Sequence, residues 1–263
     1  MALASVLFRP GRHYRQELFY SGLRKHGYKV IEGPASHPSP EDVLVLWNRF
    51  QRDEQVARSY EKAGARVLIT ENGYIGQDDK GQGLFAMAQS QHNGAGSWPI
   101  GGPERWEKMH VELNPWRSNG DCLLLLPQRG LGPPGIAMPQ RWEQFMIRKL
   151  GELTRRSSRL RPHPGLDKSN YEPYKDLRGC WAAVTWGSGA AIKALAEGYP
   201  VFHEMPNWIG ASAAVFMGGK RFKSIEEPFL GDRLPMFGRL AWAQYSSEEV
   251  ESGFAFSWLL GLE

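Results

Sequence analysis

The sequence predicts an α/β protein made of two halves, each a largely parallel β-sheet covered by helices. Short apolar runs alternate with helical patterns near the N-terminus, a stretch rich in Gly and Pro interrupts them, and the alternation then starts again. The chain has 263 residues, a length that suits one large domain or two small ones. We expect one half over residues 1–118 and the other over residues 119–263.

The first half starts with a clear alternation of strands and helices. Apolar runs typical of buried strands occupy residues 3–8, 28–31, 41–47 and 66–70. Helical spacing predicts helices over residues 13–26 and up to about residue 63, which end at Gly27 and Gly64. Residues 72–120 hold many Gly, Ser, Asn and Pro, so we expect a long irregular region there, with one short helix near residues 103–110.

The second half repeats the pattern. Apolar runs predict strands over residues 122–128, 160–163, 182–185 and 200–203. Helical patterns occupy residues 139–156 and 187–197. The tail, residues 234–262, predicts two helices, the last of them capped by Ser246 ahead of Glu248 and Glu249. Ligands of such sheets bind beyond the carboxyl ends of the strands, so a cleft between the halves is the expected site.

Composition and charge are typical of an ordinary globular protein without a membrane span. The chain is 41% hydrophobic and 23% charged, as in ordinary globular proteins, and its net charge of +4 is too small to indicate a nucleic-acid partner. Basic clusters in residues 1–30 and 148–161 fit anionic ligands or solvated helix faces equally well. No apolar run reaches the roughly 18 residues of a membrane span, and no secretory leader is apparent, so we expect a cytoplasmic protein.

Cysteine usage agrees with that expectation. Cys122 and Cys180 both begin apolar runs, which is typical of buried, reduced thiols in a cytosolic protein. The spacing of Cys and His does not indicate a metal site, and we expect neither a metal nor another cofactor. The oligomeric state is not predictable from the sequence.

The segment TWGSG, residues 185–189, is the first candidate for chemistry. It joins a predicted strand to a predicted helix, where free backbone N–H groups and the helix dipole favour an anion. Gly187 and Gly189 would let a phosphate approach the backbone, and Thr185 and Ser188 would add hydroxyl groups. The same residues also suit a turn that only caps the helix.

Two other polar turns follow strands of the same half. Arg161 and His163 lie in Arg-Pro-His-Pro, whose prolines restrict the turn and would project the histidine beside a phosphate. Gln128, Arg129 and Gly130 follow the apolar run at residue 122. Because parallel strands end at one edge of a sheet, we expect the three turns to converge.

These motifs resemble the nucleotide-sugar half of GT-B glycosyltransferases, and in particular the capsule-polysaccharide and sialic-acid transferases of bacteria. The similarity covers about residues 122–204 and is carried by His163-Pro164, by Thr185 to Ser188, and by the Glu197-x-Gly-x-Pro-Val run. The turn has one Ser rather than a Ser-Ser pair, and the chain is short for the fold, so the resemblance does not fix the nucleotide.

The resemblance implies two Rossmann-like halves that face a cleft, final helices that return to the first half, and a nucleotide-sugar donor held without a metal. The three turns and the resemblance together give the expected donor-binding residues: Gln128, Arg129, Gly130, Arg161, His163, Thr185, Gly187, Ser188, Gly189 and Glu197.

The first half would then bind the acceptor, for which we expect Arg12, Asn48, Arg49 and Asn72. An inverting transfer needs a base near the acceptor hydroxyl. Glu71 is the first candidate, His92 the second and the pair Asp78-Asp79 the third, while His163 would assist the leaving phosphate. Each of these carboxylates also suits a purely local role in a turn.

The acceptor stays open between a saccharide, a lipid-linked sugar and 5-hydroxymethylpyrimidine DNA of the kind that phage enzymes modify. Two alternatives from other classes remain. A sugar-nucleotide epimerase would share the two-half layout, and a non-catalytic protein would bind nucleotides or nucleic acid without turnover.

Overall fold

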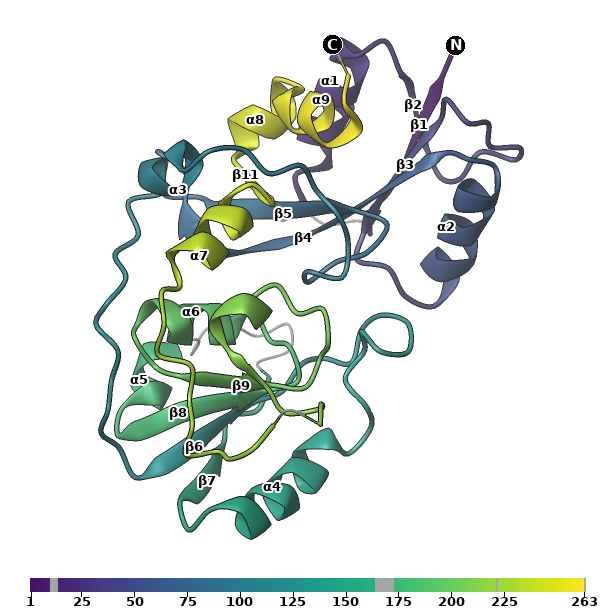
Figure 1. The fold of residues 1–263 in the computed structure, drawn as a ribbon. Coiled ribbons are helices and arrows are strands. Elements are labelled where there is room, and N and C mark those ends of the chain that lie inside the picture. Colours follow the sequence, from purple (N-terminus) through teal and green to yellow (C-terminus); the bar gives the residue numbers. More distant parts are fainter. Residues whose placement is uncertain (10–13, 164–172, 221, 263) are drawn as a thin grey trace. The chain divides into compact units, whose positions relative to one another are not determined.

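The computed structural model describes residues 1–9, 14–163, 173–220 and 222–262. The chain divides into two compact units, each with its own sheet (Figure 1). Unit 1 comprises Met1–Met109 together with Arg239–Glu263, and unit 2 comprises His110–Gly238. None of the helices in the described ranges is long and apolar enough to cross a membrane.

The sheet of unit 1 has six strands in its described residues, in the order β11-β5-β4-β3-β1-β2. The parallel strands are β1 (Leu3–Leu7), β2 (Lys29–Glu32), β3 (Val43–Trp47) and β4 (Arg66–Gln77). At the other edge, β5 (Gly83–Gln89) and β11 (Gln244–Tyr245) run antiparallel to their neighbours. The expected α/β architecture is present, with a mixed rather than purely parallel sheet.

Helices cover both faces of this sheet. Helix α1 (Gln16–Lys25) joins β1 to β2, and α2 (Arg52–Lys62) joins β3 to β4 in the opposite direction across the sheet. Right-handed crossovers in opposite directions place the two helices on opposite faces. Figure 1 shows α1 beside α8 (Ser247–Glu251) and α9 (Phe254–Leu260), with α2 away from them. On the α2 side, Leu44, Leu46, Tyr60, Val67 and Ile69 form a buried core.

The region expected to be irregular contains regular structure. β4 continues past Thr70 to Gln77 and pairs with β5, with a register shift between Asn72 and Gln77. The side chain of Gln244 fills this irregularity: its Oε1 accepts hydrogen bonds from the N–H groups of Tyr74 (2.6 Å) and Ile75 (3.2 Å). The expected short helix is α3 (Glu104–Lys108). The hairpin therefore depends on a residue far along the chain.

Three helices, rather than the expected two, occupy the C-terminal tail within the described residues: α7 (Leu234–Ala241), α8 and α9. Ser246 caps α8, not the last helix, in a reciprocal capping box with Glu249. Helices α8 and α9 pack on α1, so the end of the chain belongs to unit 1. Gly22 on α1 makes this packing close, because a Cβ there would lie 2.0 Å from the carbonyl oxygen of Val250.

Unit 2 contains a five-stranded sheet in its described residues, all parallel, in the order β10-β9-β8-β6-β7. The strands are β6 (Cys122–Leu126), β7 (Ser157–Leu160), β8 (Cys180–Thr185), β9 (Val201–His203) and β10 (Val215–Phe216). The helical elements are α4 (Trp142–Leu153), α5 (Pro173–Leu177), α6 (Ala190–Ala196) and the 3₁₀ turn η2 (Ala211–Ala213).

Apolar residues at helical spacing explain how α4 packs on this sheet. Trp142, Met146 and Leu150 recur every four residues and are buried in one core cluster with Leu123 and Leu125. Strand β7 lies earlier in the chain than the expected residues 160–163, so Arg161 and His163 follow the strand rather than end it. This shift places both residues beyond the carboxyl end of β7.

Candidate functional site

The carboxyl edge of the unit 2 sheet brings the predicted polar turns together. β6 lies between β7 and β8, so the turns after these three strands are neighbours. From β6 the chain leads to β7 on one side and then to β8 on the other, which makes the β6/β8 junction the point where the strand order reverses. Ligands of doubly wound sheets bind at such junctions.

Thr185 has a structural role in the TWGSG turn. Its Oγ1 donates a hydrogen bond to the carbonyl of Leu126 (2.7 Å) and accepts one from the N–H of Ser188 (2.8 Å). The residue is fully buried. This hydroxyl therefore links the end of β8 to the end of β6 and shapes the start of α6. The sequence pattern did not distinguish this role from contact with a ligand.

Gln128 joins the β6 turn to the TWGSG turn directly. Its Nε2 donates a hydrogen bond to the carbonyl of Gly187 (2.6 Å). Gly187 is closely packed, because a Cβ there would lie 2.8 Å from the sulfur of Met205, which would have to move. Arg129 and Gly130 follow Gln128 and are both exposed. Arg129 is thus an exposed cationic residue that follows β6, the strand next to β8.

The remaining donor candidates lie farther from this junction. The side chain of Arg161 forms an ion pair with Asp176 of α5. His163 is exposed, while Pro164 lies outside the described residues. Glu197 follows α6 at the end opposite Gly189, where its carboxylate accepts a hydrogen bond from Asn114 (3.0 Å). The structure therefore does not bring Glu197 together with the turn.

His203 was not a candidate, but it lies beside Thr185 in the β8/β9 register. Its ring is buried between Trp208 and Phe216, with centroids 5.3 Å away in each case. Nδ1 is 2.9 Å from the carbonyl oxygen of Met205. Burial lowers the pKa of His203 to about 4, so the ring is neutral at pH 7 and supplies no positive charge to this edge.

In unit 1, Glu71 lies within β4 rather than after it. Its Oε1 accepts hydrogen bonds from the hydroxyl of Tyr74 and from the N–H of Asn93 (2.7 Å for the latter). Burial and the adjacent carboxylate raise the pKa of Tyr74 well above its ordinary value, so the phenol stays protonated. His92 is buried beside this group, and its Nδ1 has no hydrogen-bond partner among the described residues.

Arg49 is held in an internal ion-pair network. Its guanidinium contacts the carboxylates of Glu54 (2.8 Å) and Glu61 (2.5 Å), and 4% of its side-chain surface is exposed. Asn48 precedes it with a left-handed φ of 64°. Arg49 therefore fixes α2 against the end of β3.

The other unit 1 candidates lie on the surface or outside the described residues. Asn72 is exposed on β4, and Arg12 is outside the described ranges. Asp78 accepts hydrogen bonds from the N–H groups of Lys80 (3.1 Å) and Gln82 (2.8 Å). These bonds are typical of a turn, which was one of the two interpretations of the Asp78-Asp79 pair. Within the described residues, no group of three or more His, Cys, Asp or Glu is placed to hold a metal ion.

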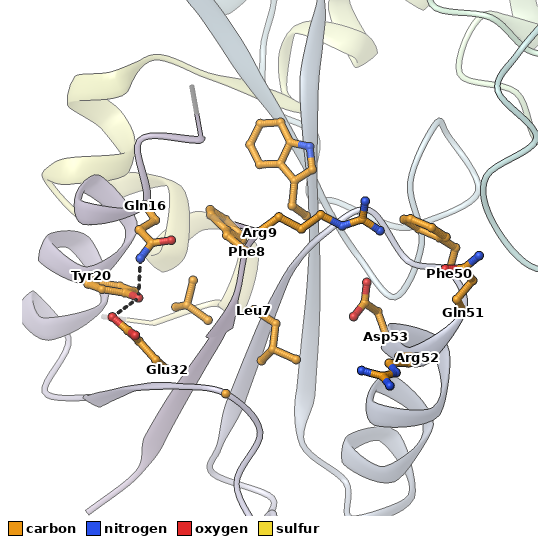
Figure 2. Close-up of a pocket in the computed structure, with 13 residues that line it drawn as sticks. Leu7, Phe8, Arg9, Gln16, Tyr20, Glu32, Phe50, Gln51, Arg52 and Asp53 are labelled. Carbon is orange, nitrogen blue, oxygen red and sulfur yellow. Dashed lines mark hydrogen bonds between the residues drawn. The ribbon is translucent and has the colours of Figure 1, made fainter. Parts of the chain in front are cut away.

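Sequence reasoning missed a pocket in unit 1, at the carboxyl ends of β1 and β3 (Figure 2). Glu32, Asp53 and Arg9 are among the side chains that line it. They come from three different strand and helix ends, so no short motif contains them. Only the strand order identifies the location in advance, and that order is not readable from hydrophobic periodicity.

Comparison with known proteins gives no match among protein-family models and none among curated sequences. Among solved structures, the chain is similar to Thermosulfurimonas dismutans KpsC, described as a beta Kdo 2,7 transferase. The TM-score is 0.53 at 13% identity, over 97% of this chain and 99% of the other. The chain has the fold of a KpsC transferase.

A second match supports this assignment. A KpsC structure from the same organism, described as a beta Kdo 2,4 transferase, has a TM-score of 0.55 at 13% identity, over 90% of this chain and 89% of the other. The similarity to bacterial sugar transferases predicted from the C-terminal motifs is thereby confirmed at the level of the fold.

Proposed function

We propose that the protein is a glycosyltransferase that moves a sugar from a nucleotide-sugar donor to a hydroxyl acceptor. The observation that carries the proposal is the fold shared with two KpsC transferases along nearly the whole chain. Both KpsC structures are described as Kdo transferases, so an acidic sugar such as Kdo is the first donor to test. The acceptor we propose is a saccharide, and hydroxymethylated DNA is the alternative to be tested beside it.

The arrangement of unit 2 supports a donor site at the β6/β8 junction. Glycosyl transfer leaves a negative charge on the departing phosphate, and positioned donors that stabilise this charge accelerate the reaction. Arg129 is an exposed cation that follows β6, and Ser188 and Gly189 directly precede α6 after the neighbouring strand β8. We assign phosphate contact to Arg129 and to the Ser188-Gly189 turn, with His163 at the neighbouring strand end. Thr185 and Gln128 would hold the turn in shape.

A thermal-shift panel tests the proposal. UDP-, GDP-, CMP- and dTDP-sugars are added to the wild type and to Arg129→Met and His163→Ala. A ligand at 100 times its Kd stabilises the folded state by about 2.7 kcal/mol, which raises the Tm by several degrees. We expect one nucleotide to stabilise the wild type and the shift to collapse in Arg129→Met.

Arg148→Met is the matched control, because it removes the same charge from an exposed position on α4. An equal loss of the shift in this control would point to general electrostatics and contradict the assigned site. Absence of any nucleotide-induced shift in the wild type would contradict the donor proposal itself.

Turnover separates the enzyme from the two alternatives. Release of nucleotide only when an acceptor is present indicates transfer, and release without an acceptor favours an epimerase or a hydrolase. Binding without any turnover favours the non-catalytic nucleotide-binding protein.

A further inference from the structure

Unit 1 contains a pocket of about 570 Å³ at the carboxyl edge of its parallel strands. Residues at the ends of β1, β2 and β3 line it, together with residues of α1 and of the first turn of α2. Its size is within the range of small-molecule sites, which are about 300–1,000 Å³.

The pocket lies at the point where the strand order of unit 1 reverses. β1 has β2 on one side and β3 on the other, and α1 and α2 lead away in opposite directions. The ends of such strands diverge because their connections leave on opposite faces, and ligands of doubly wound sheets occupy the resulting crevice. Topology alone thus predicts a ligand here, independently of any likeness to another protein.

Aromatic rings form part of the lining and are held in fixed orientations. Phe8 packs edge-on against Trp47, with ring centroids 5.5 Å apart, and against the buried Phe19 at 4.8 Å. Phe50 lies under the guanidinium of Arg9, 5.1 Å from the ring centroid. Rings held in this way offer rigid, flat apolar surfaces at small entropic cost.

A hydrogen-bonded chain of polar groups forms one side of the pocket. Gln16 Nε2 donates to the hydroxyl of Tyr20 (3.0 Å), which donates to Oε1 of Glu32 (3.2 Å), as Figure 2 shows. Burial, and then the Glu32 carboxylate, raise the pKa of Tyr20 to about 12, so this phenol remains a donor. The Glu32 carboxylate is thereby oriented and keeps lone pairs for further donors.

Asp53 and Arg52, at the start of α2, form the opposite side (Figure 2). Asp53 is half-buried, and among the described residues no group donates a hydrogen bond to its carboxylate. Burial raises the pKa of Asp53, and the Arg9 guanidinium partly offsets this effect. A half-buried carboxylate without a donor is a favourable position for a ligand hydroxyl group.

The balance of charges decides which class of ligand fits. Arg9 and Arg52 are matched by Glu32 and Asp53, so the lining provides no excess positive charge for a phosphate. Carboxylates accept from hydroxyl groups, the amides of Gln16 and Gln51 both donate and accept, and aromatic faces contact the C–H face of a sugar ring. A ring with many hydroxyl groups meets all three requirements.

We propose that this pocket binds the terminal sugar ring of a saccharide acceptor, with Glu32 and Asp53 accepting hydrogen bonds from its hydroxyl groups. The proposal rests on the proposed glycosyltransferase function and gives that reaction a substrate class. It also favours a saccharide over DNA as the acceptor, because a phosphate backbone would require an excess of cations.

The experiment measures saccharide binding without a donor. An array of bacterial polysaccharide fragments identifies a glycan, and saturation-transfer difference NMR with calorimetry then gives its Kd and its contact face. We expect binding to the wild type, with the strongest saturation on one C–H face of the terminal ring. The Kd should rise about 10-fold or more in Asp53→Asn and in Glu32→Gln, since each loses a charge-assisted hydrogen bond.

Glu41→Gln is the matched control, because Glu41 is exposed and lies before the amino end of β3, away from the carboxyl ends that line the pocket. It should leave the Kd unchanged. The nucleotide-sugar thermal shift is measured on every variant and should also stay unchanged. The same experiment gives the Tm of each variant without ligand, and an unchanged Tm separates loss of the pocket from loss of the fold.

Several results would overturn the proposal. Unchanged glycan affinity in Asp53→Asn and Glu32→Gln would place the glycan elsewhere, and loss of the nucleotide-sugar shift in Asp53→Asn would make the pocket a donor site. Binding of a hydroxymethylcytosine duplex that requires Asp53 would replace the saccharide by DNA. If no glycan binds, the pocket proposal fails, and the nucleotide-sugar shift shows whether the proposed function fails with it.

Discussion

Gly198 offers the sharpest test of how a motif in this sequence relates to its structure. It adopts a left-handed φ of 82°, and a Cβ at this position would lie 2.0 Å from the carbonyl oxygen of Pro115. The segment around Pro115 is fixed by hydrogen bonds from Asn114 N–H to Ala196 (2.8 Å) and from Arg117 N–H to Gly198 (2.7 Å). Gly198→Ala therefore introduces both backbone strain and a collision with hydrogen-bonded backbone.

The expected loss of stability can be worked from these contacts. A left-handed conformation costs a non-glycine residue about 1–2 kcal/mol. Moving the segment at residues 114–117 away weakens two backbone hydrogen bonds, each worth about 0.5–1.5 kcal/mol. We expect Gly198→Ala to lower the unfolding free energy of unit 2 by about 2–5 kcal/mol, measured by urea unfolding followed by Trp fluorescence.

Gly179→Ala separates the two contributions. Gly179 has a similar φ of 74°, but a Cβ there would meet nothing within 4 Å. This variant should lose only the conformational part, about 1–2 kcal/mol. Equal losses in the two variants would refute the reasoning, because they would mean that the approach of Pro115 adds nothing to the requirement for glycine.

Three further predictions concern buried or partly buried groups of unit 2. Thr185→Val should lower the unfolding free energy by about 2–4 kcal/mol, because it leaves the Leu126 carbonyl and the Ser188 N–H without their hydrogen-bond partner. Thr154→Val, near the surface, should lower the unfolding free energy by less in the same urea assay. Burial lowers the pKa of His203 to about 4, so the unfolded chain binds a proton at this residue more readily than the folded one. The unfolding free energy should therefore rise by about 3 kcal/mol between pH 4 and pH 6.5. His203→Phe should flatten this part of the pH profile, and an unchanged profile would contradict the buried neutral ring. The sulfur atoms of Cys122 and Cys180 lie 3.0 Å apart on neighbouring strands, so mild diamide treatment should join them in a disulfide. Mass spectrometry should show the loss of two hydrogens in the wild type and no such loss in Cys122→Ser. If the wild type keeps both hydrogens, the close approach of the two thiols is contradicted.

The elements that periodicity predicted well are those stabilised by their own neighbours. Strands β1, β3, β6 and β8 are predominantly apolar and buried on both faces of their sheets, and they lie close to the expected ranges. Helix α4 repeats Trp142, Met146 and Leu150 on one face. In each case the pattern that stabilises the element lies within the element.

The β4–β5 hairpin was not predicted, because its stabilising contacts lie outside its own sequence. Its register is interrupted after Asn72, and the N–H groups of Tyr74 and Ile75 find their acceptor in Gln244, about 170 residues along the chain. A local window that contains Asn-Gly and several further glycines favours a turn. Only the tertiary partner makes an extended strand the more stable choice there.

The candidate site residues were likewise predictable by type but not by their hydrogen-bond partners. Thr185 and Arg49 lie at or just after strand ends, as expected, whereas Glu71 lies within β4; all three side chains are already bound by the protein itself. A hydroxyl or carboxylate that supports a turn has the same sequence signature as one that contacts a ligand. Hydrogen-bond partners separate the two cases, and these partners come from other strands and helices.

The two units share one strand order at their centres, β2-β1-β3-β4 in unit 1 and β7-β6-β8-β9 in unit 2. The rule that places ligands at the reversal of strand order therefore applies to both. In unit 2 the polar groups near the reversal cluster in short turns such as TWGSG, so sequence patterns pointed to it. In unit 1 the polar groups come from α1, β2 and α2, so Asp53 and Glu32 can be recognised as pocket residues only once the order of the strands is known. The proposed glycosyltransferase would bind a donor and an acceptor, and each unit has one such junction.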